Sequence, residues 1–125
     1  MRYLFIVALL LTSAVAQAAD DKKVDFTVVL TDDGQNIPDP VQCNAKPAPC
    51  VAYLTLGGAA YYALRSPEPG LSWDENIRRA DLAAAVRDSK SYSVLPADLD
   101  LIRKQMAKIY GPGLIHAAAK ALEAK

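Results

Sequence analysis

The sequence predicts a mostly helical α+β domain, in which an N-terminal β-hairpin is followed by about four helices. Residues 24–30 read VDFTVVL, and a run so rich in β-branched and aromatic residues is typical of a strand. The pair Asp33-Gly34 predicts a hairpin turn, because glycine adopts a positive φ angle without steric cost. After residue 55 the apolar residues recur at helical spacing instead. Strands followed by a run of helices are typical of the α+β class.

Short strands are expected at three further places. A return strand would begin at Ile37, but Pro38 and Pro40 cut it short, because proline cannot donate a ladder hydrogen bond. Residues 50–54 (CVAYL) favour a third strand. Residues 92–95 are extended and form either a fourth strand or a linker.

The first two helices are predicted from the side chains that cap their N-termini. Thr55 is a good N-cap for a helix over residues 56–65. Ser72 and Glu75 have the spacing of a capping box, which predicts a helix that begins at Trp73 and ends near Arg87.

The last two helices begin at Pro96 and Pro112, because proline suits the first turn of a helix. The helix after Pro96 carries an apolar stripe formed by Leu99, Ile102, Met106 and Ile109. We expect the Trp73 helix and the last helix to cover this stripe within one molecule, because the turns between them are short. The last helix buries a second apolar set, Leu114, Ile115, Ala118 and Leu122.

The Trp73 helix is apolar on two sides, which is typical of a helix sandwiched in a bundle or of one that meets a partner. One side carries Trp73, Ile77, Ala80 and Ala84, and Leu82 and Val86 lie nearly opposite. Tyr61 and Tyr62 point to different sides of the preceding helix, so one of them is expected to be less buried. The candidate partner surface is therefore formed by Tyr61, Tyr62, Leu82 and Val86.

The first residues have the parts of a secretory signal peptide. Arg2 is followed by an uncharged apolar run over residues 3–11 and by the small-residue site Ala16-Gln17-Ala18. We expect cleavage after Ala18, with cleavage after Ala19 as the near alternative. A membrane anchor would need about 20 apolar residues, and this run is about half as long. The sequence thus predicts a signal peptide over residues 1–18 and one domain over residues 19–125, placed in the periplasm or secreted.

Two cysteines, Cys43 and Cys50, are expected to form a disulfide, because an even number of cysteines in an exported chain favours pairing. Two free thiols are the alternative. The C-x6-C spacing is not the C-x-x-C of thiol oxidoreductases. A zinc site needs four ligands, and the only histidine, His116, is far along the chain.

The charge balance indicates which partners the chain lacks. The 14 Lys and Arg residues are matched by 14 Asp and Glu residues, so there is no basic excess for nucleic acid and no polybasic patch for anionic membranes. No phosphate-binding glycine motif is present, and we expect no cofactor and no metal.

Catalytic residues are hard to find in this sequence. His116 is the only candidate base for a nucleophilic serine or cysteine, and it lies in an alanine-rich helix. The carboxylate pairs Asp74 with Glu75 and Asp98 with Asp100 could serve a hydrolase. Both pairs stand at helix starts, where acidic residues also stabilise the helix. We therefore expect no enzymatic activity and keep a small carboxylate-dependent hydrolase as an alternative.

Several short motifs together resemble a group of small uncharacterised proteins of temperate phages and prophages. The motifs are VDFT (24–27), LTLG (54–57), AL (63–64), RRADLA (78–83), DLDLIRKQMAKIYGP (98–112) and KALE (120–123). The resemblance implies a single domain over nearly the whole mature chain, and it implies no particular activity. The signal peptide and the segment from Pro38 to Cys50 depart from the pattern of this group.

These observations favour an exported, non-enzymatic module that binds an unidentified protein partner and is itself a monomer. A prophage-derived assembly or structural protein is the alternative from a different class.

Overall fold

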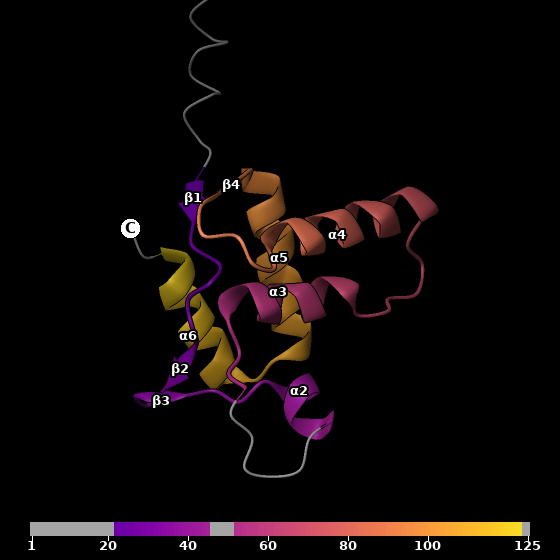
Figure 1. Cartoon of the computed structure of the whole chain (residues 1–125). Helices are drawn as coiled ribbons and strands as arrows, with labels where there is room; N and C mark the ends of the chain where they lie inside the picture. Colours follow the sequence, from indigo (N-terminus) through magenta and orange to yellow (C-terminus); the bar gives the residue numbers. More distant parts are fainter. Residues whose placement is uncertain (1–21, 46–51, 124–125) are drawn as a thin grey trace, which may run out of the picture.

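The computed structural model describes residues 22–45 and 52–123, and it confirms the predicted α+β class (Figure 1). These residues form five helices and two small antiparallel sheets. The helices are α2 (Pro40–Ala45), α3 (Leu56–Arg65), α4 (Trp73–Val86), α5 (Pro96–Ile109) and α6 (Pro112–Glu123). The strands are β1 (Lys22–Val24), β2 (Thr31–Asp32), β3 (Gln35–Asn36) and β4 (Tyr92–Val94).

The predicted hairpin turn is confirmed. Strands β2 and β3 pair with Thr31 opposite Asn36. Asp33 has a φ angle of 52° and Gly34 one of 78°, as a two-residue hairpin turn of the I′ type requires.

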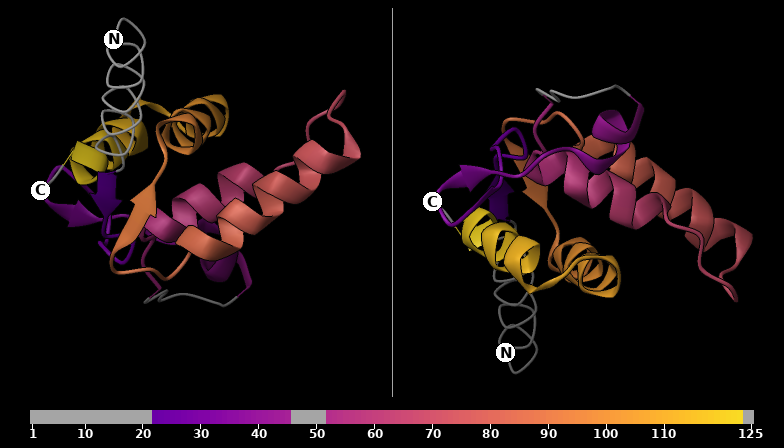
Figure 2. Two further views of the ribbon diagram at one scale, coloured as in Figure 1. Left: turned by 90° about the horizontal axis from the view of Figure 1, so that it is seen from above. Right: turned by 90° about the horizontal axis from the view of Figure 1, so that it is seen from below.

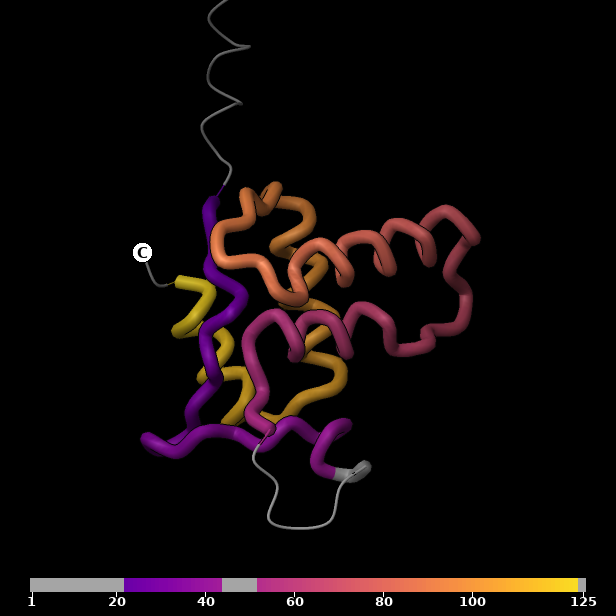
Figure 3. Tube along the Cα trace, in the orientation of Figure 1, coloured from indigo at the N-terminus to yellow at the C-terminus, as the bar shows by residue number. Residues whose placement is uncertain are grey.

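The long strand expected over residues 24–30 is not formed. Strand β1 ends at Val24, and the carboxylate of Asp25 then accepts hydrogen bonds from the backbone N–H of Thr27, at 2.9 Å, and from its hydroxyl, at 2.6 Å. Such a local side-chain turn competes with a strand ladder, which explains the break. The segment continues along α6 towards the hairpin (Figure 3).

Of the two alternatives for residues 92–95, the strand is formed: β4 covers Tyr92–Val94 and pairs with β1 so that Lys22 lies opposite Val94. Pro40 opens a helix that the sequence did not predict, α2, instead of only ending a strand. The buried carboxylate of Asp39 caps α2 by accepting hydrogen bonds from the backbone N–H groups of Val41, at 3.0 Å, and Gln42, at 3.1 Å. Of the expected third strand, Tyr53 forms an isolated bridge with Pro38.

The predicted helix caps are confirmed for α3 and α4. The hydroxyl of Thr55 accepts a hydrogen bond from the backbone N–H of Gly58, and that of Ser72 accepts one from Glu75. Gly57 lets α3 approach the end of α4, because a Cβ atom at this position would lie 2.1 Å from the carbonyl oxygen of Arg87.

Helix α3 is the central helix of the domain, because it packs against both α4 and α5. Ile102 and Met106 of the predicted stripe are buried, whereas Ile109 is 43% exposed. The packing of α5 differs from the prediction, because α3 packs against α5 where the sequence predicts the Trp73 helix. The N-terminal end of α4 points away from β1, β4 and α6 (Figure 2). On another side of α5, Met106 shares an apolar hollow with Ile115 of α6.

Within the described ranges, no helix has the length and apolar character needed to cross a membrane. The predicted signal peptide lies outside the described residues.

Candidate functional site

The two apolar sides of α4 have different environments in the folded protein. Leu82 is 6% exposed and Val86 is fully buried, and both belong to the core. Val86 offers no surface to a partner, and Leu82 offers only the small part of its side chain that lines a groove beside α4, so this part of the prediction is wrong. The reason is that α4 lies along α3 with its Leu82 side facing inward.

The opposite side of α4 is open to solvent. The Trp73 side chain is 79% exposed, and Ile77, one turn further along, is 44% exposed. Ala84 continues this side two turns later and is also exposed. Trp73 lies at the end of α4 that projects from the rest of the domain (Figure 2). Single exposed apolar residues are ordinary, but a tryptophan in line with an isoleucine forms an apolar face of the kind found at interfaces.

A groove runs beside this face. Its volume is about 490 Å³, and it lies between α4, β4 and the start of α5. Ile77 and Tyr92 contribute apolar surface, and Asp81 and Asp98 contribute carboxylates. We call the set Trp73, Ile77, Asp81 and Ala84 the α4 face.

The unpaired charges around the α4 face are acidic. Arg78 pairs with Asp98 at 2.7 Å, and Arg79 pairs with Glu68 at 2.6 Å, so both arginines are neutralised. Among the described residues, no ion pair neutralises Asp74, Glu75 or Asp81. The α4 face therefore combines apolar side chains with uncompensated negative charge.

Glu68 also binds the ammonium group of Lys108 on α5, and this contact ties the loop before α4 to the body of the domain. The hydrogen bonds from Lys108 and Arg79 lower the pKa of the Glu68 carboxyl. The carboxylate stays ionised at neutral pH, so it can form ion pairs with both Arg79 and Lys108.

Tyr61 and Tyr62, the other two residues of the predicted partner surface, are both half-buried. The Tyr62 hydroxyl donates to the Asp39 carboxylate, and burial together with this hydrogen bond raises the pKa of Tyr62. The Tyr61 ring lies against Arg65 and Arg87 and meets Tyr62 edge to face, with the ring centres 5.8 Å apart. Tyr62 thus has a structural partner, whereas Tyr61 lies beside two cations.

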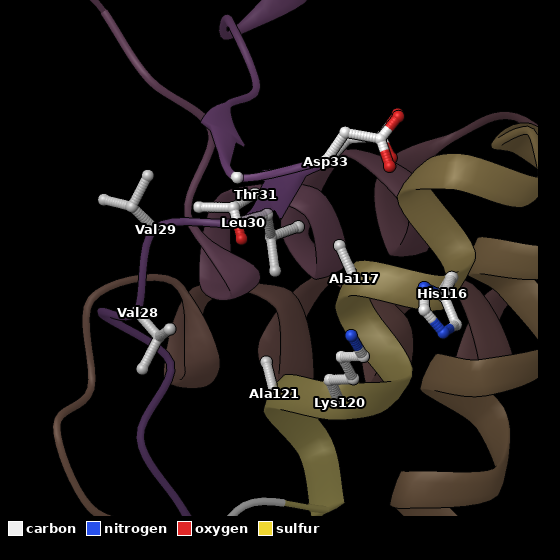
Figure 4. Close-up of a pocket in the computed structure, with 11 residues that line it drawn as sticks. Val28, Val29, Leu30, Thr31, Asp33, His116, Ala117, Lys120 and Ala121 are labelled. Carbon is white, nitrogen blue, oxygen red and sulfur yellow. The ribbon is translucent and has the colours of Figure 1, made fainter.

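His116 lines a separate pocket of about 370 Å³ between the β2–β3 hairpin and α6 (Figure 4). Asp33 lies on the hairpin side of this pocket, and His116 and Lys120 project from α6 (Figure 4). His116 makes no hydrogen bond or ion pair to another residue that the structure describes. The geometry therefore joins His116 to neither a nucleophile nor an orienting carboxylate.

Three of the four carboxylates considered for hydrolysis lie in the first turns of helices. Asp74 and Glu75 begin α4, and Asp98 begins α5 and pairs with Arg78. Asp100 pairs with Lys104 at 3.0 Å. Helix-start stabilisation and ion pairing account for these positions.

Cys43 is on α2, and its sulfur lies 3.6 Å from the carbonyl oxygen of Ala52. Cys50 lies outside the described residues, so the Cys43–Cys50 disulfide stays a prediction. In residues 22–45 and 52–123, no three His, Cys, Asp or Glu side chains gather closely enough to hold a metal ion.

No family model matches the chain, and neither the curated proteins nor the solved structures include a significant match. The resemblance to phage proteins therefore stays a prediction.

Proposed function

We propose that this protein is an exported, non-enzymatic module that binds another protein through the α4 face. The observation that carries the proposal is the Trp73 side chain, 79% exposed at the projecting end of α4. Trp73 is not part of the hydrophobic core, although tryptophan has the largest of all side chains. Tryptophan is enriched among residues that dominate binding energy, because it covers a large area with few rotatable bonds.

The charges around Trp73 indicate the chemistry of the partner. Asp74, Glu75 and Asp81 have no ion-pair partner among the described residues, and both nearby arginines are neutralised. A complementary segment would place an apolar side chain against Trp73 and Ile77 and flank it with lysine or arginine. Complementary charges of this kind speed association and set orientation.

The groove beside Ile77 extends the proposed surface. At about 490 Å³ it is large enough for one or two side chains of the partner, and Tyr92 supports it from β4. Export is part of the proposal because the sequence predicts a signal peptide over residues 1–18.

In the test, the purified protein is first used to capture and identify a partner from envelope extract. Binding of the identified partner to the wild type and to Trp73→Ala is measured by calorimetry. Truncating a tryptophan at the centre of an interface costs at least about 2 kcal/mol, so the dissociation constant should rise about 30-fold. Asp81→Asn should slow association at low salt and have little effect at high salt.

Val41→Ala is the matched control, because Val41 is 55% exposed and lies on α2, away from the α4 face. Its affinity should equal that of the wild type. A partner that binds Trp73→Ala and the wild type equally well would show that the α4 face is not the binding surface.

A further inference from the structure

Two arginines converge on the Tyr61 ring. The guanidinium carbon of Arg87 lies 4.5 Å from the ring centre, and that of Arg65 lies 5.2 Å from it. Contacts at this distance are attractive because the ring face carries negative potential. Neither arginine forms an ion pair or a side-chain hydrogen bond with any residue in ranges 22–45 and 52–123.

This arrangement differs from that of the neighbouring arginines. Arg78 and Arg79 each lie within 2.7 Å of a carboxylate, which compensates their charge. Arg65 and Arg87 are two like charges held beside one ring, and they repel each other. A bound anion would remove that repulsion and would satisfy the N–H donors at their edges.

The ring that gathers these arginines is held in place. Tyr61 packs edge to face on Tyr62, whose hydroxyl donates to both oxygens of the buried Asp39 carboxylate. The backbone of Arg87 is fixed as well, because its carbonyl oxygen lies against Gly57 of α3 and its N–H donates to Ala83. Fixed recognition groups lose less conformational entropy when a ligand binds.

We propose that Tyr61, Arg65 and Arg87, the arginine–tyrosine cluster, bind carboxylate side chains of an acidic protein segment. The planar guanidinium matches a carboxylate with two parallel N–H···O bonds, which a lysine ammonium group cannot form. The cluster shares no residue with the α4 face and has the opposite charge. It therefore recognises a different chemical group. A negative result for one surface would leave the proposal for the other surface unaffected.

The test follows the arginine Nε–H signals by NMR while a capped glutamate-rich peptide is added to the wild-type protein. The signals of Arg65 and Arg87 should move and saturate. Arg103 is the internal control, because it is exposed on α5 and also lacks an ion pair among the described residues. Its signal should stay in place.

Substitutions then separate geometry from charge. Arg87→Ala and Arg65→Ala should each weaken peptide binding by about tenfold, the loss of one charge-assisted hydrogen-bonded contact. Arg87→Lys keeps the charge and should also weaken binding, whereas Arg103→Ala should leave it unchanged.

Three results would overturn the proposal. Equal movement of the Arg103 signal would indicate non-specific attraction to a polyanion. Saturable binding of inorganic phosphate without binding of the peptide would assign the cluster to another ligand. Shifts that follow the concentration of the protein itself, and not that of the peptide, would indicate contact between copies of this chain.

Discussion

The Tyr62 hydroxyl lies 3.1 Å and 3.0 Å from the two carboxylate oxygens of Asp39, and so it joins the middle of α3 to the start of α2. Asp39 is buried, and its Oδ1 atom also accepts the N–H groups that open α2. The same contact supports the ring against which Tyr61 packs. One hydrogen-bonded pair therefore holds both an unpredicted helix and the arginine–tyrosine cluster.

Tyr62→Phe should lower the free energy of unfolding by about 1–3 kcal/mol, because it removes a hydrogen bond from a buried carboxylate. Urea denaturation measures the change. Tyr53→Phe is the control, since Tyr53 is exposed and its hydroxyl has no hydrogen bond among the described residues. Equal stability of the two variants would show that the contact with Asp39 contributes little.

Ionisation of the Tyr110 hydroxyl should lower the free energy of unfolding at high pH. Burial, followed by the nearby Tyr62 and Asp39, raises the pKa of Tyr110 to about 12. An unfolded tyrosine ionises near pH 10, so the folded state holds this proton more tightly. The contribution of Tyr110 is therefore complete below about pH 10 and is lost as the pH rises towards about 12.

Urea denaturation at several pH values between about 9 and about 12 measures this loss of stability. Absorbance titration follows the formation of the phenolates over the same range. Tyr110→Phe should remove the last-titrating phenolate and flatten the fall in stability. It also removes the hydrogen bond that the hydroxyl donates to the Ala59 carbonyl at 2.8 Å, so it should be less stable at neutral pH. An unchanged slope in the variant would contradict the assignment.

Ile102→Ala should destabilise the protein by about 2–5 kcal/mol, because Ile102 is fully buried and the smaller side chain leaves a cavity. The melting temperature should fall by many degrees while the protein remains a monomer by light scattering. Ile109→Ala is the matched control on the same helix, since Ile109 is exposed, and it should change stability little. A dimer that dissociates on Ile102→Ala without a change in melting temperature would place the stripe at an interface between copies.

Export should remove residues 1–18, because Ala16 and Ala18 supply the small side chains that signal peptidase requires. N-terminal sequencing of the exported protein should begin at Ala19. Exported protein that still carries Met1 would rule out cleavage at this site.

Cys43 and Cys50 should form a disulfide in the exported protein. Closing so short a loop stabilises the fold by about 2.5 kcal/mol in the chain-entropy model. Mass spectrometry of the native protein should show a mass lower by two hydrogen atoms than after reduction. Rapid alkylation of both thiols without reductant would show that the pair is free.

The features predicted correctly from the sequence depend on contacts between residues close in the chain. The Asp33-Gly34 turn needs only two positive φ angles, and the caps at Thr55 and Ser72 need only an N–H three residues away. The helical stripe around Ile102 also belongs to one element, so its buried part could be predicted from spacing alone.

The tertiary structure decided which side of each element is covered. Helix α4 has two apolar sides, and its sequence favours neither, but the approach of α3 buries Leu82 and Val86 and leaves Trp73 in solvent. The position of Gly57 beside the Arg87 carbonyl permits that approach, and it joins residues 30 positions apart in the chain. Burial depends on such long-range neighbours, whereas turns and caps depend on the nearest few residues. For this reason the sequence determined α3, α4, α5, α6 and the hairpin turn, whereas only the folded chain formed α2 and placed the α4 face and the arginine–tyrosine cluster at the surface.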